Sequence, residues 1–471
     1  MSANLENRWM TAFGALLRTS VHRRDARTAL GHRSACGITL RVRPRRVAGC
    51  GVVSLRAIVT PTPLGRYRGE VAGYRDLLRT PGVGRIIAAQ LTARFPNGMT
   101  SLAVLLHIEH VTGSYGAAGL VLAAASVGQA VSGPVTSRWM GIWGMRRVLT
   151  LTLLVCASAI TTLALVQTSL PVYMALGLVA GLSTPPVQSA VRTIYPKMVN
   201  SRQLTPLFSL DASLQEIIWI LAPVVITFVA TQVGTWEALI LIVVILLGGG
   251  GWFILSPEVG RVRIPRSRRA FGKVLTKPPV VLATVIGFLL IGACSAVEAG
   301  VVATFGHGGL EAGIVLAVFS IGSLAGGLSS GSIPMGPWAM ARRLGIVAVG
   351  LAATMVSLDV WWLGGTLLFA GIGIAPALAV IFAMTSASVK FSDTAEAYGW
   401  VGTGQLIGAA AGSAVAGFLI DGVGPQGAYV AATAFAVIGV AVAVVFVRGF
   451  PDLRHRDASP IPDTEPVGTI T

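Results

Sequence analysis

The sequence has 471 residues, of which 54% are apolar and only 12% are charged, and its mean hydropathy is +0.74. These values exclude a water-soluble globular protein, which would carry more polar surface. The formal net charge of +17 does not indicate a nucleic-acid partner, because the basic residues gather in every second connection between apolar segments.

The first 80 residues are rich in Arg, contain no Lys and hold no apolar run long enough to cross a bilayer. Three interpretations are open: a disordered basic tail that contacts anionic lipid, a transit sequence that is removed, or a region upstream of the true start. We favour the third and place the start near Val59, so that residues 1–58 would not belong to the mature protein.

Twelve apolar stretches follow, each close to the roughly 20 residues that cross a hydrocarbon core of about 30 Å as a helix. Long unbroken apolar runs favour helices over the alternating strands of a barrel. We therefore expect an all-α polytopic membrane protein. The predicted spans are 86–107, 115–137, 147–168, 171–193, 207–232, 236–256, 280–305, 310–333, 343–363, 365–388, 396–420 and 426–448.

Basic residues predict the orientation of these spans. The connections between spans one and two, three and four, and each later pair of this kind contain no Lys or Arg, whereas the alternate connections are basic. The richest connection is residues 257–279. Because basic segments stay on the cytoplasmic side, we expect both termini and this loop in the cytoplasm, with the protein in the cytoplasmic membrane. The predicted regions are 1–80, a first bundle 83–256, the loop 257–279, a second bundle 280–449 and a tail 450–471.

A repeat divides the spans into two sets of six. Residues 118–133, AGLVLAAASVGQAVSG, match residues 312–327, AGIVLAVFSIGSLAGG, at eight of sixteen positions with an offset of 194. A sparser match at an offset of 190 relates spans four and five to spans ten and eleven, and includes Pro186 and Pro376. Similar composition alone could produce some of these matches, but their order agrees with the topology. The sequence therefore predicts two pseudo-symmetric six-helix bundles in parallel orientation.

With these features, residues 83–449 resemble the major facilitator superfamily of secondary transporters. The family's loop between spans two and three reads Gly, three residues, Asp, Arg, one residue, Gly, then basic residues. Here GPVTSRWMGIWGMRRVL matches it in part, with Ser137 in place of the acid. The resemblance implies a cytoplasmic gate loop, in which Ser137 could still cap a helix but cannot form the ion pair of the family's acid. The expected gate residues are Gly133, Arg138, Arg146 and Arg147.

Ionisable side chains inside spans are costly and mark functional positions. Arg94 in span one and Glu216 in span five lie at the same predicted depth, about 13 Å from the cytoplasmic ends of their spans, so we expect them to pair. A structural ion pair and a role in substrate or proton handling remain equally open. Their repeat counterparts, Phe288 and Leu406, are apolar.

Other polar residues in the spans are fewer. Glu298 in span seven is either a proton-coupling carboxyl or a hydrated group near the outer end, and we favour hydration. We expect Asn97 and Gln405 to face a central cavity and Asp211 to cap a helix near the cytoplasmic surface. Prolines interrupt helical hydrogen bonding in matching spans, and the expected bends are at Pro185, Pro186 and Pro376.

The glycines of span eleven, Gly404, Gly408 and Gly412, recur every four residues and indicate close helix packing. The Gly-Pro motif that the family's proton antiporters carry in span five is absent, so no motif demonstrates export. No phosphate loop, nucleophile motif or metal-ligand spacing is present, and we expect a monomer with no enzymatic activity, cofactor or metal. We expect a proton-coupled secondary transporter of a small molecule, with drug or metabolite efflux favoured. The alternative is a transporter-like sensor or scaffold that transports nothing.

Overall fold

The computed structural model describes residues 74–463 except residues 268, 307–309, 332 and 455. The predictions for residues 1–73 and 464–471 lie outside this range. The described residues all belong to one compact unit, Glu70–Thr471. They are almost entirely helical, and the one β-bridge among them joins Lys390 to Ile461.

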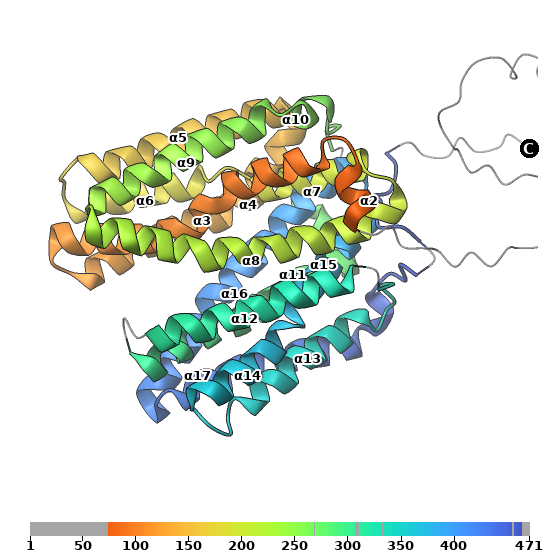
Figure 1. The fold of residues 1–471 in the computed structure, drawn as a ribbon. Coiled ribbons are helices and arrows are strands. Elements are labelled where there is room, and N and C mark those ends of the chain that lie inside the picture. The colour runs from red at the N-terminus through yellow and green to blue at the C-terminus, as the bar shows by residue number, and fades with distance from the viewer. Residues whose placement is uncertain (1–73, 268, 307–309, 332, 455, 464–471) are drawn as a thin grey trace, which may run out of the picture. The chain divides into compact units, whose positions relative to one another are not determined.

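The first six spans form one bundle (Figure 1). A short helix α2 precedes it, and the fourth span consists of two helices, α6 and α7. The elements are α2 Tyr74–Arg79, α3 Val83–Thr112, α4 Tyr115–Trp143, α5 Met145–Leu165, α6 Leu170–Leu182, α7 Val187–Met198, α8 Ser201–Gln232 and α9 Thr235–Leu255.

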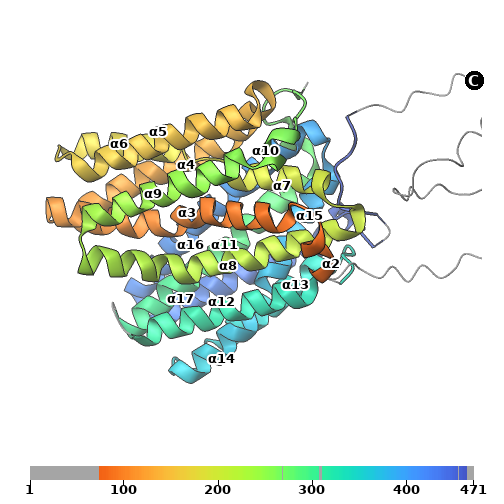
Figure 2. The ribbon, with the colours of Figure 1, turned by 45° about the horizontal axis from the view of Figure 1, so that its top comes forward.

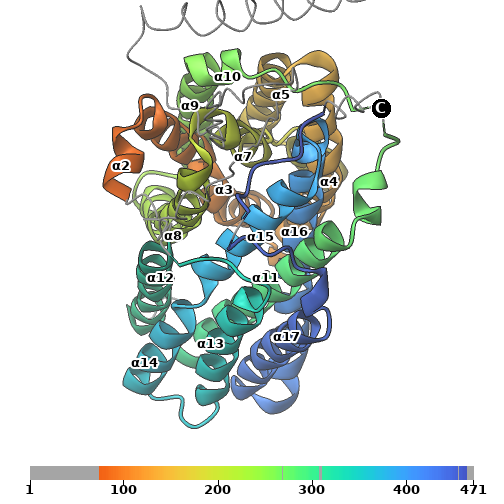
Figure 3. The same cartoon turned by 90° about the vertical axis from the view of Figure 1, so that its right-hand side faces the viewer.

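The central segment and the second bundle follow, and the tenth span is again divided, into α14 and α15. Figure 2 shows this set of helices beside the first, and Figure 3 looks at the end that carries the central segment. We call this end of the molecule, which carries α10 and η1 of the central segment, the loop end. The elements are α10 Pro257–Arg261, η1 Lys273–Thr276, α11 Pro278–Phe305, α12 Leu310–Ser330, α13 Ala339–Ala353, α14 Val360–Gly371, α15 Ile374–Ser388, η2 Phe391–Asp393, α16 Thr394–Val423, α17 Gln426–Val445 and η3 Val447–Gly449.

Ten spans among the described residues are long and apolar enough to cross a membrane, counting α6 with α7 and α14 with α15 as one span each. The other two helices occupy the places of spans one and nine. In α3 the interior carries polar residues such as Gln90 and Arg94, and α13 has only 15 residues. The predicted all-α polytopic fold is confirmed.

The predicted ninth span, 343–363, is wrong at its end. Helix α13 stops at Ala353, and Asp359 begins the next helix by accepting hydrogen bonds from the backbone N–H groups of Trp361 and Trp362. An aspartate in this position satisfies donors that the first turn leaves free. The apolar run continues through the turn, so hydropathy alone hid the boundary.

The repeated segments make the same contacts in both bundles. A side chain added at Gly128 of α4 would collide with the backbone of α6 at Leu178, and one added at Gly322 of α12 would collide with the backbone of α14 at Leu368. Both pairs differ by the predicted offsets of 194 and 190. The repeat therefore preserves a close helix contact, which requires glycine because the two backbones approach so nearly.

The glycines of span eleven likewise serve packing. Gly404, Gly408 and Gly412 of α16 lie against the backbone of α11 at Thr284, Phe288 and Gly292. This contact fixes α16 to the second bundle, so that the opposite face of α16 is free to meet the first bundle.

Candidate functional site

A buried ionic cluster lies inside the first bundle near the loop end. Its centre is Asp211 of α8, which is fully buried. Arg94 of α3 approaches Asp211 Oδ1 at 3.3 Å, and Arg192 of α7 donates from Nε to Oδ2 at 2.9 Å. The Tyr195 hydroxyl donates to Oδ1 at 3.1 Å, and so does the Gln90 amide. The carboxylate thus receives donors on both oxygens, as a buried charge requires.

The cluster has more positive than negative charge and reaches the second bundle. Two guanidinium groups, with side chains only 4% and 2% exposed, share one carboxylate. Arg94 also donates to Gln90 at 2.9 Å and to Gln215. Arg192 lies 3.3 Å from the centre of the Phe382 ring on α15, where the aromatic face stabilises a desolvated cation.

The predicted pairing of Arg94 with Glu216 is therefore wrong, as is the predicted capping role of Asp211. Helix α8 begins at Ser201 rather than 207, so Asp211 lies about 15 Å along its helix and Glu216 about 22 Å, against about 16 Å for Arg94 on α3. Asp211 and Gln215, four residues apart, share the face that meets Arg94. Glu216 lies about 100° further round the helix.

Glu216 instead links the two bundles at mid-height. Its carboxylate accepts a hydrogen bond from Ser323 Oγ of α12 at 2.9 Å, and Ser323 Oγ accepts from the Ala375 N–H of α15 at 3.1 Å. Ala375 lies in the first turn of α15, where the helix dipole favours negative charge. Glu216 is 8% exposed. In the part of the chain that the structure describes, its hydrogen-bond partners are neutral.

Glu298 lies on α11 of the second bundle. Its side chain is exposed. Asn97 of α3 is also exposed, whereas Gln405 of α16 packs on Gly287 with a buried amide nitrogen that has no partner in the structure. Pro185 and Pro186 lie between α6 and α7, and Pro376 lies in the first turn of α15.

A second ionic group closes the loop end between α4 and α16. Arg138 Nη1 lies 2.5 Å from Glu396 Oε2, and the Gly272 N–H donates to Glu396 Oε1 at 2.8 Å. Arg269 lies 3.6 Å from Asp393. Deeper in the same interface, the Thr403 hydroxyl donates to the Ala130 carbonyl at 2.7 Å.

The other predicted gate residues take different positions. Ser137 does not cap a helix, because α4 continues to Trp143, and its buried hydroxyl has no partner in the structure. Gly133 contacts Gly399 and Thr403 of α16. Arg146 donates to the Ser256 carbonyl at the end of α9 at 3.1 Å, and Arg147 is exposed.

A third ion pair at the loop end joins Arg85 of α3 to Glu258 of α10. Burial acts to raise the pKa of the Glu258 carboxyl, but hydrogen bonding from Arg85 and the backbone together with the charge of Arg85 outweighs it. The pKa therefore lies below its usual value. This pair holds the central segment to the first bundle.

The bundles meet at the loop end and separate beyond it. In the described part of the chain, the side-chain hydrogen bonds and ion pairs that join them lie between the loop end and mid-height. On α3, Gln90 and Arg94 are buried, whereas Asn97 and Ser101, further along the same face, are exposed.

The facing helices α4 and α16 show the same change from buried to exposed residues with distance from the loop end. Ser137 and Ala130 of α4 are buried or half-buried, and Ser126 and Ala123 on the same face are exposed. On α16 the exposed residues that follow Thr403 on its face are Ile407, Ala410 and Ala414. The arrangement is closed at the loop end and open at the opposite end.

Comparison with known proteins agrees with this architecture. A model of the Major Facilitator Superfamily matches residues 86–358 and 299–467. No curated protein matches the sequence.

Several solved transporters share the fold at low sequence identity. A bacterial homologue of the iron transporter ferroportin in an outward-facing state has 14% identity and a TM-score of 0.64, covering 77% of this chain and 98% of that chain. The human organic anion transporter MFSD10 (TETRAN) has 15% identity and a TM-score of 0.59, with coverage of 76% and 98%. The proton:xylose symporter XylE has 13% identity and a TM-score of 0.58, with coverage of 80% and 96%. The chain belongs to the Major Facilitator Superfamily of membrane transporters.

Proposed function

We propose that this protein is a proton-coupled secondary transporter that moves a small molecule across the cytoplasmic membrane by alternating access, with efflux of a drug or metabolite as its direction. The observation that carries the proposal is Glu216, a carboxylate at mid-height that joins the first bundle to Ser323 of the second. Protonation of Glu216 would remove the charge that Ser323 and the first turn of α15 stabilise. Proton binding would thus change the strength of a contact that must break when the bundles rock.

We propose Glu298 of α11 as a second proton-binding carboxyl, because its side chain is exposed. Glu216 and Glu298 are then the two acidic groups at which protons would bind. A positively charged substrate would compete for the same pair, and this competition would couple substrate and proton in opposite directions, as efflux requires. Asn97 and Gln405 are the proposed neutral polar groups of the substrate path.

The ionic groups take different roles in this proposal. Arg94, Asp211 and Arg192 hold α3, α7 and α8 together as one rigid unit, while Arg138 and Glu396 lock the cytoplasmic gate, which we place at the loop end because the basic residues gather there. The divided spans, broken near Pro185, Pro186 and Pro376, supply the bends for rocking.

The test is flux in reconstituted vesicles with an imposed pH gradient and a panel of organic cations, anions and neutral compounds. We expect gradient-driven flux of at least one compound in the wild type and its loss in Glu216→Gln and Glu298→Gln. Glu311→Gln is the matched control, because Glu311 is an exposed carboxylate in the first turn of α12. Unchanged coupling in both variants would contradict proton coupling, and a well-folded protein that moves no compound would favour the sensor or scaffold alternative.

A further inference from the structure

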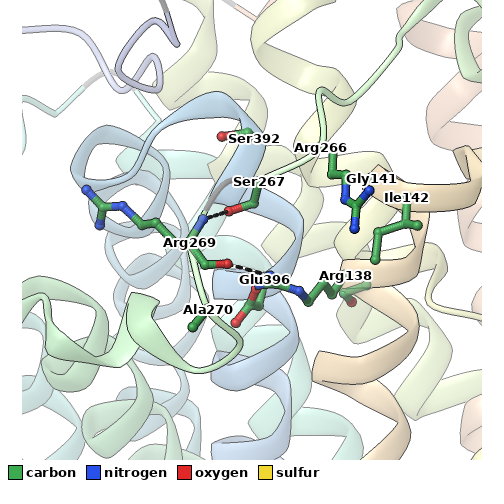
Figure 4. A pocket seen from close by; sticks show the side chains of 10 residues that line it. Arg138, Gly141, Ile142, Arg266, Ser267, Arg269, Ala270, Ser392 and Glu396 are labelled. Atoms are coloured by element: carbon green, nitrogen blue, oxygen red, sulfur yellow. Dashed lines mark hydrogen bonds and ion pairs between the residues drawn. The ribbon is translucent and has the colours of Figure 1, made fainter.

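A pocket of about 650 Å³ lies at the loop end, where α4 of the first bundle faces α16 of the second. Its walls come from three separate parts of the chain: the last turns of α4, the central segment at residues 266, 267, 269 and 270, and the region where η2 leads into α16. Figure 4 shows the side chains around it. The volume is in the range of small-molecule sites.

The charge lining this pocket is positive. Arg138, Arg266 and Arg269 contribute three guanidinium groups, against the carboxylate of Glu396 in the pocket and that of Asp393 beside it. Both Glu396 oxygens already have donors, from Arg138 and from the Gly272 N–H. An anion in the pocket would therefore meet excess positive charge rather than a free carboxylate.

Two donors in the pocket remain available. Arg266 is exposed and makes no hydrogen bond or ion pair among the described residues, and in Figure 4 its side chain lies next to Gly141, above Arg138. Ser137 is fully buried, and its hydroxyl oxygen has no hydrogen-bond partner in the structure. Leaving a buried hydroxyl unpaired is costly, and a ligand in the pocket would remove that cost.

We propose that this pocket binds a phosphate-bearing anion, held by the Arg266 guanidinium and the Ser137 hydroxyl, and that the anion stabilises the closed loop end. Arginine suits phosphate because its planar group donates two parallel hydrogen bonds to neighbouring oxygens. The phosphate could be that of a soluble monoester or of an anionic lipid headgroup, which present the same chemistry.

A ligand in this pocket would affect opening of the loop end, because the residues that line the pocket belong to both bundles. Ser137 belongs to the first bundle and Glu396 to the second, so opening of the loop end would divide the pocket. A ligand that binds only one of two conformations shifts the equilibrium toward it. This second step rests on the proposed alternating access, whereas the binding step does not.

The binding step is tested by calorimetric titration of the purified full chain with glycerol 3-phosphate in detergent, and by thermal stability in nanodiscs with and without phosphatidic acid. We expect saturable binding in at least one arm, and the arm identifies the source. Arg266→Ala should weaken binding at least about tenfold through loss of a charge-assisted contact. Arg263→Ala, an exposed arginine of the same segment that does not line the pocket, should not.

Ser137→Ala separates binding from folding. Removing an unpaired buried hydroxyl should leave the stability of the ligand-free protein unchanged or higher, yet weaken phosphate binding several-fold. Ser209→Ala is the matched control, since Ser209 also carries a buried unpaired hydroxyl but lies on α8, outside the pocket. Absence of saturable binding in both arms, or equal binding by the Arg266→Ala and Arg263→Ala proteins, would overturn the proposal.

The gate step is tested by spin labels at two exposed loop-end positions, Arg147 on α5 and Arg342 on α13. The ligand should shift the distance distribution toward its shorter component in the wild type and not in Arg266→Ala. A ligand that binds with an unchanged distribution would refute stabilisation of the closed state, even if flux experiments support transport.

Discussion

Replacement of Asp211 by Asn should strongly destabilise the protein. The side chain is fully buried and accepts hydrogen bonds from Arg94, Arg192, Tyr195 and Gln90. Among the described residues, Asp211 is the only carboxylate in contact with the guanidinium groups of Arg94 and Arg192, whose side chains are 4% and 2% exposed, and the amide would remove its charge. Breaking a buried ion pair on one side costs about 3–5 kcal/mol, because the partner charge remains without compensation.

The expected loss of stability in Asp211→Asn can be judged against the smaller loss expected in Glu216→Gln. Glu216 has neutral hydrogen-bond partners, so its neutral variant should lose only about 0.5–1.5 kcal/mol. Both losses can be measured from tryptophan fluorescence during denaturant unfolding in detergent. A double-mutant cycle between Arg94 and Asp211 should give a coupling energy above about 1 kcal/mol, and one between Arg94 and Glu216 a value near zero. A loss below about 1 kcal/mol for Asp211→Asn would refute the assignment of Asp211 as the counter-charge.

Three further predictions concern the gate, the topology and the terminus. Arg138→Glu should open the loop end, which would be seen as faster labelling of a cysteine placed between the bundles. The added change Glu396→Arg should restore closure. If labelling stays fast in the double variant, the ion pair does not lock the loop end. A cysteine at Gln167, in the exposed turn between α5 and α6, should react with an impermeant thiol reagent from outside cells, and one at Arg263 should not; the opposite pattern would reverse the orientation. Deleting residues 2–58 should leave insertion and flux intact, and loss of an inserted protein would show that this segment is required.

The sequence predicted the helices and their repeat because both can be recognised from the residues of each segment alone, without knowing which helices pack together. Apolar length identifies spans, and the repeated glycines mark contacts that tolerate no side chain. Gly128 and Gly322 illustrate the second signal, since each meets the backbone of the equivalent neighbouring helix.

The ionic partner of Arg94 was predicted wrongly because two side chains pair only when they lie at the same depth and on facing sides of their helices. Both properties are counted from the residue at which each helix begins. A capping box marks the true start of α8, with the Asn200 side chain accepting from the Gln203 backbone and Gln203 reaching back to Asn200. The pattern is visible in the sequence as NSRQ. With that start, Asp211 rather than Glu216 would have been placed level with Arg94. Glu396 was missed for another reason: it lies in the first turn of α16 and acts on a helix far away in sequence.

Closure of the loop end combines symmetric packing with asymmetric charge. Gly133 of α4 meets Thr403 of α16, and the repeat-related residues, Gly327 of α12 and Ser213 of α8, meet in the same way. Arg192 even contacts Phe382, its own counterpart at the offset of 190, as residues near a pseudo-two-fold axis do.

The Arg138–Glu396 lock has no such counterpart, because the residue equivalent to Glu396 is Pro206. Small residues at all four symmetric positions allow both interfaces to close, but ionic chemistry reinforces the α4–α16 side alone. On the α8–α12 side the link is instead the hydrogen bond between Glu216 and Ser323. If the bundles rock as rigid bodies, both interfaces must separate together. A proton on Glu216 would therefore weaken one side of the closed state, and a phosphate at Arg266 would strengthen the other, so the two sites should act in opposite directions on the same equilibrium.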